Sequence, residues 1–426
     1  MLLLENIRFL ITQNDNREVM ENVDVLVKYG RIVEIGKNLS DHYSPSEVLD
    51  CSGKVVLPGL INTHTHASMT AFRGISDNKL LEDWLHEDIF PAEESLTQED
   101  AFYGAKAASI EMLKTGTTCF SDMYFHMSEV ANAVEDTGIR AVLARGLTDI
   151  NEEQDLDQVL DELVDLVSRE RIKPAIAPHS IYTCSEDLLL DSKEIAEKFN
   201  LLYHIHLSET EEENTESRNA RGMSPTEYLD NLGILDSNTA AAHGTHLSDN
   251  DVEILAQNGV GIAHNPSANL KLGSGIADIP ELLQSGVKVG LGTDGPASNN
   301  NLNLFEEAKI SALIHKRDDP RMINEQQVLD MMTVEAAKVL GVEDEIGSVE
   351  KGKKADLITI DLDRPDMKPF HGKKGVISNL VYSFSGDLAD SIVDGEILVR
   401  DGELVDVDEE QVLRELQRRS EKFNSG

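Results

Sequence analysis

Short apolar runs alternate with segments of helical periodicity from about residue 58 to about residue 340. Apolar runs of strand length are typical of buried strands, and helical patterns such as those of residues 105–114 and 249–257 lie between them. Eight strands alternating with helices indicate a parallel closed barrel, so we predict an α/β fold with a (β/α)8 TIM-like barrel. The predicted strands lie near residues 58–64, 117–123, 140–146, 174–178, 201–207, 239–243, 259–264 and 287–293.

The two ends of the chain show short strands separated by turns instead. Neither end has enough alternating apolar positions for a core of its own, so the two can share one small β-sandwich. A barrel takes about 250 residues, which leaves room for this second unit in a chain of 426. We predict a barrel domain of residues 58–345. Residues 1–57 and 346–426 would form the composite β-sandwich domain, with a polar helix over residues 408–422.

The first predicted barrel strand ends in two histidines, His64 and His66. Alternate side chains of a strand point to the same face, so the two imidazoles project together from its C-terminal end. Imidazole is the commonest metal ligand among side chains, and two on one face supply half of a tetrahedral site. A pair of ordinary histidines at a strand end is the alternative, and downstream partners decide between the two.

Such partners follow later predicted strands. His204 and His206 lie in the fifth strand, His243 ends the sixth, and Asp294 follows the eighth. Histidine is scarce, with 13 in 426 residues, so its coincidence with strand ends favours a metal site. The side chains of His204 and His206 point to the same face of the strand. His204 lies one layer further from the strand's C-terminal end, so we expect it to be a core histidine.

The chain is strongly acidic, with 78 Asp and Glu against 38 Lys and Arg and a formal net charge of −40. Nucleic-acid binding is disfavoured, because phosphate contacts need a basic surface. The acidic excess is spread along the chain, and we interpret it as adaptation to a salty cytoplasm. An unusually acidic protein of an ordinary cytoplasm is the alternative.

Salt is expected to raise the thermal midpoint of this protein as KCl goes from low to molar concentration. Screening weakens the repulsion within the acidic chain, since the Debye length falls from about 10 Å at 0.1 M to about 3 Å at 1 M. Thermal unfolding in a KCl series measures the effect. Equal midpoints in dilute buffer and in molar KCl would contradict the salt-adaptation hypothesis.

The compartment is predicted from cysteines and from hydrophobic runs. The three cysteines, Cys51, Cys119 and Cys184, are odd in number and far apart, which favours a reduced cytoplasm over a disulfide framework. The apolar start of the chain is followed at once by Glu5 and Asn6, so we expect no signal peptide. We also expect no membrane association, because no apolar run reaches spanning length.

Eight collinear stretches resemble the amidohydrolase superfamily, in particular its methylthioadenosine/S-adenosylhomocysteine (5′-deoxyadenosine-type) deaminase branch. The PGxxxxHxH, HxxE and GTDG signals are specific for the superfamily. The resemblance implies a metal-dependent barrel with a β-sandwich from both chain ends, and hydrolytic deamination of an adenine nucleoside to the inosine form. The stretches are PGLINTHTH (58–66), RGISDNKLLEDWL (73–85), FSDMYFH (120–126), APHSIYTCS (177–185), HIHLSET (204–210), AAHGTHL (241–247), HNPSANLKLGSGIA (264–277) and GLGTDGPASNNNLN (290–303).

The resemblance assigns the metal ligands to His64, His66, His206 and Asp294. Three neutral nitrogens and one carboxylate suit one divalent ion per subunit; zinc is favoured, and iron also fits imidazole. Such an ion lowers the pKa of bound water to about 7. Related enzymes with two metals use a modified lysine at the end of the fourth strand. Residues 174–178 contain no lysine, so we predict a mononuclear site.

Catalysis is assigned to Glu209, His243 and Asp294. In HxxE deaminases of this superfamily the glutamate contacts the substrate, protonates the ring nitrogen beside the attacked carbon and helps to pass a proton to the amino group that departs as ammonia. Asp294 would accept the proton of water, and His243 would orient the hydroxide. A solvated acid among its acidic neighbours, residues 211–213, is the alternative for Glu209.

The substrate contacts come from the resemblance alone. Trp84 would pack against the nucleoside, or act as a buried anchor. Glu93 would accept hydrogen bonds from both ribose hydroxyls, His179 would contact the substrate, and Ser298 would contact the base. Arg145 matches a family arginine that binds the carboxylate of the longer substrate. In the family this arginine is contributed by a neighbouring subunit, so we expect a homo-oligomer.

The family's second arginine is missing. The corresponding residues 149–160 contain no arginine and are rich in Asp and Glu. This departure disfavours S-adenosylhomocysteine and leaves 5′-methylthioadenosine, 5′-deoxyadenosine and adenosine as equal candidates.

Two other functions remain open. One is a different amidohydrolase reaction, on guanine, cytosine or another heterocycle, or on a C–Cl or amide bond; Glu93 argues for a ribose instead. The other is a barrel that binds without catalysis, against which the full ligand set with Glu209 argues. A cytidine-deaminase zinc site is excluded, because the chain lacks the PCxxC motif.

Overall fold

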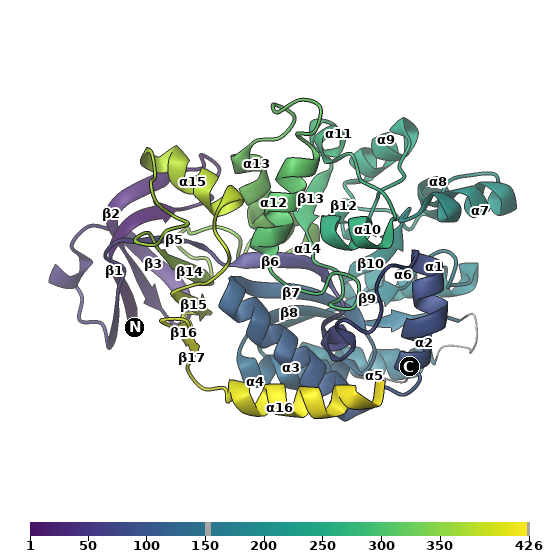
Figure 1. The fold of residues 1–426 in the computed structure, drawn as a ribbon, viewed down its shortest axis with the longest axis horizontal. Coiled ribbons are helices and arrows are strands. Elements are labelled where there is room, and N and C mark those ends of the chain that lie inside the picture. The colour runs from purple at the N-terminus through teal and green to yellow at the C-terminus, as the bar shows by residue number, and fades with distance from the viewer. Residues whose placement is uncertain (150–154, 424–426) are drawn as a thin grey trace.

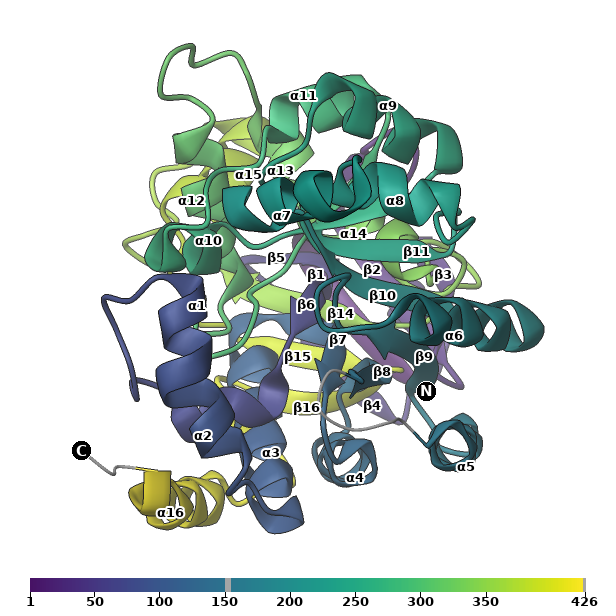
Figure 2. The ribbon, with the colours of Figure 1, turned by 90° about the vertical axis from the view of Figure 1, so that its right-hand side faces the viewer.

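The computed structural model describes residues 1–149 and 155–423, and it confirms the predicted barrel. Eight parallel strands pair in chain order from β6 to β13. Figure 2 shows helices α4, α5 and α6 outside strands β7 to β10. The strands are β6 (Leu60–Thr65), β7 (Thr117–Tyr124), β8 (Arg140–Leu147), β9 (Ile172–Pro178), β10 (Leu202–Leu207), β11 (Thr239–His243), β12 (Gly261–His264) and β13 (Lys288–Leu291).

A buried asparagine joins the first and last strands of the barrel. The Asn62 side-chain amide donates to Thr293 Oγ1 at 2.8 Å, and the Thr293 backbone N–H donates to Asn62 Oδ1 at 3.1 Å. The backbone N–H of Asp294 donates to the His64 carbonyl at 3.0 Å. The end of β13 is therefore held against β6, next to the predicted metal ligands.

The apolar run of residues 58–66 is divided between two sheets. Pro58 ends β5 (Lys54–Pro58) of the second sheet, and β6 begins at Leu60. Between them a Cβ on Gly59 would lie 2.0 Å from Thr118 Oγ1, so only glycine fits this crossing. A continuous apolar pattern cannot reveal such a division, because both halves are buried.

Many of the barrel helices begin at a residue whose side chain caps the first turn. Thr97 and Asp100 form a capping box at the start of α3, and Ser248 and Asp251 do so at α9. The helices are α3 (Gln98–Thr115), α4 (Met127–Thr137), α5 (Leu156–Val167), α6 (Glu186–Phe199), α7 (Glu211–Arg221), α8 (Pro225–Asn231), α9 (Asp249–Asn258), α10 (Pro266–Leu272), α11 (Ile279–Gln284), α12 (Leu304–Ile314), α13 (Glu325–Met332) and α14 (Val334–Leu340).

A helical excursion follows β6 and carries two of the predicted substrate contacts. It contains η2 (Ala67–Phe72), α1 (Leu81–Trp84), the π-helical turn η3 (Leu85–Ile89) and α2 (Phe90–Glu93). Trp84 and Glu93 each end one of these helices. The excursion thus places both residues directly after the first pair of histidines.

Both chain ends build a second sheet, as predicted. Strands β5 and β14 pair antiparallel and so join the N-terminal and C-terminal parts. The backbone N–H of Ala355, just before β14, donates to the carbonyl of Gly30, between β2 and β3, at 2.8 Å, so the β2–β3 edge of the sheet returns to the start of β14 around one apolar core. The remaining elements are β1 (Leu2–Ile11), β2 (Val19–Lys28), β3 (Arg31–Gly36), η1 (Leu39–Asp41), β4 (Glu47–Asp50), β14 (Leu357–Asp361), α15 (Gly372–Tyr382), β15 (Asp390–Val393), β16 (Glu396–Arg400) and β17 (Glu403–Leu404).

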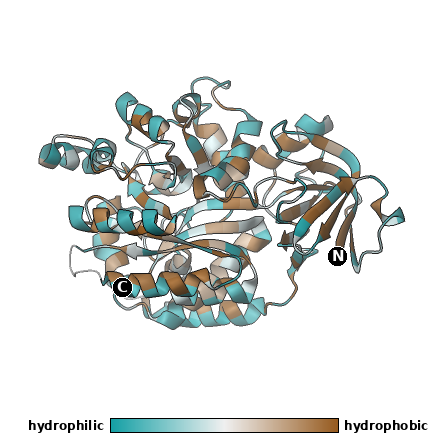
Figure 3. Cartoon of the chain, turned by 180° about the vertical axis from the view of Figure 1, so that it is seen from behind, coloured by the Kyte–Doolittle hydropathy of each residue, from teal (hydrophilic) through white to brown (hydrophobic). Residues whose placement is uncertain are grey.

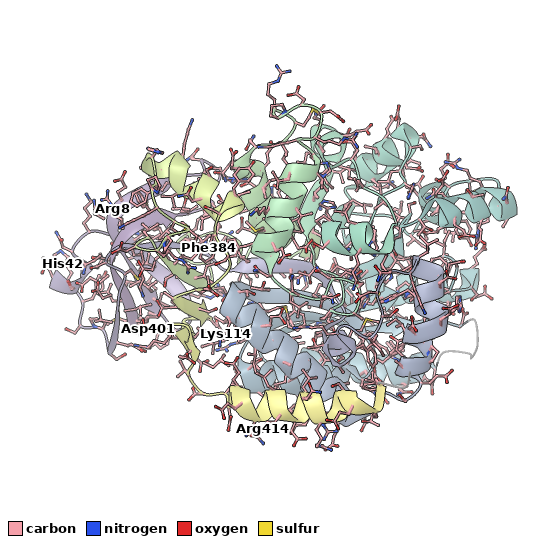
Figure 4. The ribbon with its side chains drawn as sticks, in the orientation of Figure 1. Arg8, His42, Lys114, Phe384, Asp401 and Arg414 are labelled. Atoms are coloured by element: carbon pink, nitrogen blue, oxygen red, sulfur yellow. The ribbon has the colours of Figure 1, made fainter. Side chains whose placement is uncertain are left out.

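The C-terminal helix returns from the second sheet to the barrel. Helix α16 (Glu409–Ser420) lies along α3 (Figure 1) and is followed by the turn η4 (Glu421–Phe423). Lys114, which is labelled in Figure 4, lies at the end of α3, and its Nζ pairs with Glu409 Oε2 at 2.8 Å. The Phe423 ring packs edge to face on Phe72, with ring centroids 4.7 Å apart. The predicted polar helix therefore packs on the barrel.

Apolar residues concentrate on the strands and polar residues on the outer sides of many helices (Figure 3). Among the described residues, no helix is both long and apolar enough to cross a bilayer.

Candidate active site

Three of the predicted metal ligands lie together at one end of the barrel. The ligand atoms of His64, His66 and His206 are all within 4.8 Å of one another. They meet because β6 and β10 are parallel strands whose C-terminal ends lie on the same rim. Burial, with the neighbouring histidines, lowers the pKa of His64 and of His206 well below its usual value. Both rings are therefore neutral nitrogen donors at pH 7.

Backbone carbonyls orient two of these rings. The Nδ1 atom of His66 lies 2.6 Å from the Met123 carbonyl, and Nδ1 of His206 lies 2.8 Å from the His179 carbonyl. A carbonyl only accepts, so each Nδ1 carries the proton and each Nε2 keeps its lone pair. This is the arrangement that a metal-ligating histidine needs.

The third ring is held by another histidine. His64 Nδ1 lies 3.1 Å from His204 Nε2, and His204 Nδ1 lies 3.2 Å from Ser121 Oγ. His204 is buried, as the sequence predicted, and in addition it orients His64. The His64 Nε2 atom is buried and has no hydrogen-bond partner among the described residues, which fits a nitrogen reserved for a metal.

Asp294 lies at the same point. Its Oδ1 atom is 3.3 Å from His66 Nε2 and 3.6 Å from His64 Nε2. The residue has a left-handed backbone with φ 61°, and the N–H of Gly295 donates to Oδ1 at 2.7 Å. Positive φ at a residue other than glycine is uncommon and often marks functional sites. The turn after β13 therefore directs the carboxylate back toward the histidines.

Glu209 is buried beside His243 and is not one of the solvated acids that follow it. Its Oε2 lies 3.6 Å from His243 Nε2, and Ser274 Oγ donates to its Oε1 at 3.0 Å. Burial raises the pKa of Glu209 above its ordinary value. A carboxyl with a raised pKa can hold and release a proton nearer neutral pH, which general acid–base catalysis requires.

His243 is fixed on its other side by the segment that contains α10. The Asn269 side-chain amide contacts His243 Nδ1 at 2.9 Å, and His243 Nε2 is the ring atom that faces Glu209. The His243 ring stacks on His206 with ring centroids 5.4 Å apart. This histidine is thus adjacent both to the metal-ligand group and to the buried glutamate.

The helical excursion after β6 contributes a second carboxyl, that of the half-buried Glu93. Tyr124 Oη donates to Glu93 Oε1 at 2.6 Å, and burial raises the pKa of Glu93 to about 7. Trp84 is buried in the same apolar cluster as Phe72 and Leu272, and its indole N–H has no hydrogen-bond partner among the described residues. Trp84 is therefore a packed residue of the helical excursion, and its buried indole N–H is free to donate a hydrogen bond.

His179 and Ser298 lie in loops that touch the metal-ligand group. The His179 ring centroid is 4.5 Å from that of His206, and its Nδ1 lies 2.9 Å from Thr183 Oγ1. Burial lowers the pKa of His179 to about 3, so its ring is neutral. Ser298 is buried, and its hydroxyl donates to the Gly295 carbonyl at 2.9 Å, inside the turn that presents Asp294.

Arg145 is engaged elsewhere in the chain. Its Nη1 lies 2.8 Å from Glu162 Oε1 on α5, and this ion pair faces the helix layer rather than the histidines. A contribution of Arg145 to a neighbouring subunit stays a prediction. In the acidic stretch that replaces the second arginine, residues 150–154 lie outside the described part. Asp149 accepts a hydrogen bond from the Ser185 backbone N–H at 2.7 Å.

The amidohydrolase family matches residues 55–398, which is most of the chain and includes the whole barrel. The chain belongs to the amidohydrolase family.

Curated relatives of this amidohydrolase are adenine-nucleoside deaminases by name. The chain is 43% identical over 408 residues to a 5′-deoxyadenosine deaminase of Methanobrevibacter smithii, which covers 94% of this chain and 93% of the relative. It is 42% identical over 417 residues to a 5-methylthioadenosine/S-adenosylhomocysteine deaminase of Acetivibrio thermocellus, with 95% of each chain covered.

Solved structures of other amidohydrolases share the fold. An adenosine deaminase from Xanthomonas campestris with bound zinc superposes with a TM-score of 0.95 at 29% identity and covers 100% of this chain and 99% of its own. A zinc-complexed atrazine chlorohydrolase of Arthrobacter aurescens has a TM-score of 0.92 at 26% identity and covers 99% and 100%. The family, the zinc-bound neighbours and the histidine group together support a divalent metal in this amidohydrolase.

The sequence analysis placed His204 in the core without its contact to His64, and it missed Ser274 and Asn269 as residues that support the site. His204, Ser274 and Asn269 contact His64, Glu209 and His243 respectively. A signal was available, because Ser274 and Asn269 both lie in the HNPSANLKLGSGIA stretch. Their contacts cross from one strand end to another, so spacing alone does not reveal them.

Proposed function

We propose that this amidohydrolase hydrolyses an adenine nucleoside, with water and the nucleoside giving the inosine form and ammonia. The observation that carries the proposal is the buried Glu209 carboxyl, placed between Ser274 and His243 beside the histidine group. The similarity to 5′-deoxyadenosine and methylthioadenosine/S-adenosylhomocysteine deaminases supports the class of substrate.

We propose one divalent ion per subunit, with zinc favoured over iron. The Nε2 atoms of His64, His66 and His206 and a carboxylate oxygen of Asp294 would hold it. When bound, the ion lowers the pKa of a water to about 7 and so supplies hydroxide at neutral pH. Lys173 does not serve a second ion, because its Nζ donates to the Gly341 carbonyl at 2.6 Å.

Glu209 moves the protons of the reaction. It protonates the ring nitrogen next to the carbon that bears the amino group, which makes this carbon electrophilic. It then helps to transfer a proton to the amino group, which leaves as ammonia when the C–N bond breaks. Asp294 accepts a proton from the attacking water, and the His243 Nε2 edge orients that water.

Residues of the helical excursion and of the loops beside the histidine group bind the nucleoside. Glu93 accepts hydrogen bonds from the ribose hydroxyls, with its carboxyl held by Tyr124. Trp84 packs beside the nucleoside, and His179 and Ser298 contact the base. Arg145 is already neutralised by Glu162 within its own chain, which supports a substrate without a distal carboxylate.

We expect nucleosides with a small 5′ group, such as 5′-deoxyadenosine or 5′-methylthioadenosine, to be deaminated more efficiently than S-adenosylhomocysteine. The chain lacks the second arginine for the carboxylate of the longer substrate, and one charge-assisted hydrogen bond is worth about 1.5–3 kcal/mol. The loss corresponds to roughly a tenfold to hundredfold lower kcat/KM. A side-by-side assay of ammonia release measures it, and a clear preference for S-adenosylhomocysteine would contradict it.

Two controls sharpen this assay. Glu93→Ala should lower kcat/KM for all adenosine derivatives, because all of them share the ribose. Free guanine, cytosine and a chlorinated triazine test the other amidohydrolase reactions, for which the fold of the atrazine chlorohydrolase is a precedent. Ammonia or chloride release from these compounds, with none from the nucleosides, would overturn the proposal.

We further propose a cytoplasmic homo-oligomer. The three cysteines are free and buried, which supports a reducing compartment. Light scattering on the purified protein measures the oligomeric state.

A further inference from the structure

The turn that presents Glu209 is built from an unusual succession of residues. Ser208 ends the strand region with a left-handed backbone at φ 48°, and Thr210 is the N-cap of α7. The Thr210 hydroxyl accepts a hydrogen bond from the Glu213 backbone N–H at 3.1 Å. Glu209 therefore lies in a tight connection between a barrel strand and a helix.

Glu213 reaches back to this connection from the first turn of α7. Its side chain is buried, and its Oε2 accepts a hydrogen bond from the Glu209 backbone N–H at 2.8 Å. A capping box would direct this side chain to the N-cap amide of Thr210, but here the partner is one residue earlier. Glu211 and Glu212, in the same turn, are exposed to solvent.

The other end of Glu209 is fixed by different residues. Thr245 Oγ1 donates to the Glu209 carbonyl, and Ser274 Oγ donates to its carboxyl at 3.0 Å. The carboxyl then lies 3.6 Å from His243. Among the hydrogen bonds of the described residues, the backbone N–H of Glu209 takes part only in the one to Glu213.

We propose that Glu213 is a positioning residue, which holds the backbone of Glu209 so that the Glu209 carboxyl meets the reacting atoms. This inference rests on the proposed role of Glu209 as the proton-transferring group. Loss of the Glu213 carboxyl leaves the Glu209 backbone N–H without an acceptor. It also removes a restraint on the turn in which Ser208 has a left-handed backbone. Small displacements of a catalytic group are costly, because the reaction needs near-attack geometry.

The protonation state of Glu213 makes a conservative replacement informative. Burial raises its pKa to about 8, with the adjacent Glu209 also raising it and the backbone amides opposing. At pH 7 the neutral acid therefore prevails, and glutamine has the same shape and the same carbonyl acceptor. Aspartate is shorter by one methylene and cannot reach the Glu209 amide from the same backbone.

The test compares Glu213→Ala, Glu213→Asp and Glu213→Gln with Glu212→Ala as the matched exposed control. We expect Ala and Asp at position 213 to lower kcat for 5′-deoxyadenosine roughly tenfold to hundredfold, with a smaller change in KM and an unchanged metal content. Glu213→Gln should recover most of this loss, and Glu212→Ala should resemble the wild type. If Glu213→Ala fails to fold, Glu213→Asp and Glu213→Gln still give the comparison.

Hydrogen exchange of residues 203–214 supplies a readout without substrate. The Ser208 and Glu209 amides should exchange faster in Glu213→Ala and Glu213→Asp, and at the wild-type rate in Glu212→Ala. A kcat of Glu213→Asp within about twofold of the wild type, or a Glu213→Gln variant as slow as Glu213→Asp, would overturn the inference. If Glu209→Gln is fully active, the proposed proton-transfer role of Glu209 fails instead, while exchange still reports on the turn.

Discussion

Replacing Glu209 by glutamine is expected to lower kcat by roughly 10²–10⁴ and to leave the metal content unchanged. Glutamine keeps the volume of the side chain and an oxygen that can accept from Ser274 Oγ, which lies 3.0 Å from the carboxyl in the wild type. It cannot deliver a proton to the ring nitrogen. The change therefore removes proton transfer while the metal ligands stay in place, and stopped-time assays with metal analysis measure both.

The matched control for this variant is Glu212→Gln. Glu212 is exposed, and it carries the same side chain three residues further along the chain. Its replacement should leave kcat unchanged. Near-normal activity of Glu209→Gln would instead show that another group transfers the proton, and the acid–base assignment would be wrong.

Chelation of the metal is expected to abolish deamination, and His206→Ala should lose both the metal and the activity. The reason is that the ligand atoms of three histidines converge within 4.8 Å, and loss of one of them leaves the proposed tetrahedral set incomplete. Purified protein should contain about one divalent ion per chain. Elemental analysis before and after dialysis against a chelator, followed by readdition of zinc or iron, measures the stoichiometry and identifies the active ion.

His42→Ala is the control for the histidine replacement, because His42 is exposed in the loop that follows η1, beside the second sheet (Figure 4). It should keep metal and activity. Two tightly held ions per subunit, both needed for turnover, would overturn the mononuclear interpretation.

Strand positions could be predicted because periodicity is a local property of the sequence. The eight expected barrel strands agree with β6 to β13 within a few residues, and the second sheet joins both chain ends as expected. The split at Gly59 could not be predicted, since the residues on both sides are apolar and buried. It depends on the close approach of Thr118, which is far away in sequence.

The sequence by itself determined which residues end the strands, and hence that His64, His66, His206 and Asp294 lie on one rim. Side-chain alternation along a strand and the common direction of parallel strands are sufficient for that conclusion. Roles implied by the resemblance, such as those of Glu93 and Ser298, stay predictions about a bound substrate.

Only the tertiary structure decided which neighbours support or neutralise these residues. It distinguishes the buried Glu213 from the exposed Glu212, gives His204 a role behind His64, and pairs Arg145 with Glu162. The physical reason is that burial, ion pairing and pKa depend on groups from distant parts of the chain. Local sequence patterns carry no information on those distances until the barrel closes and brings the strand ends together.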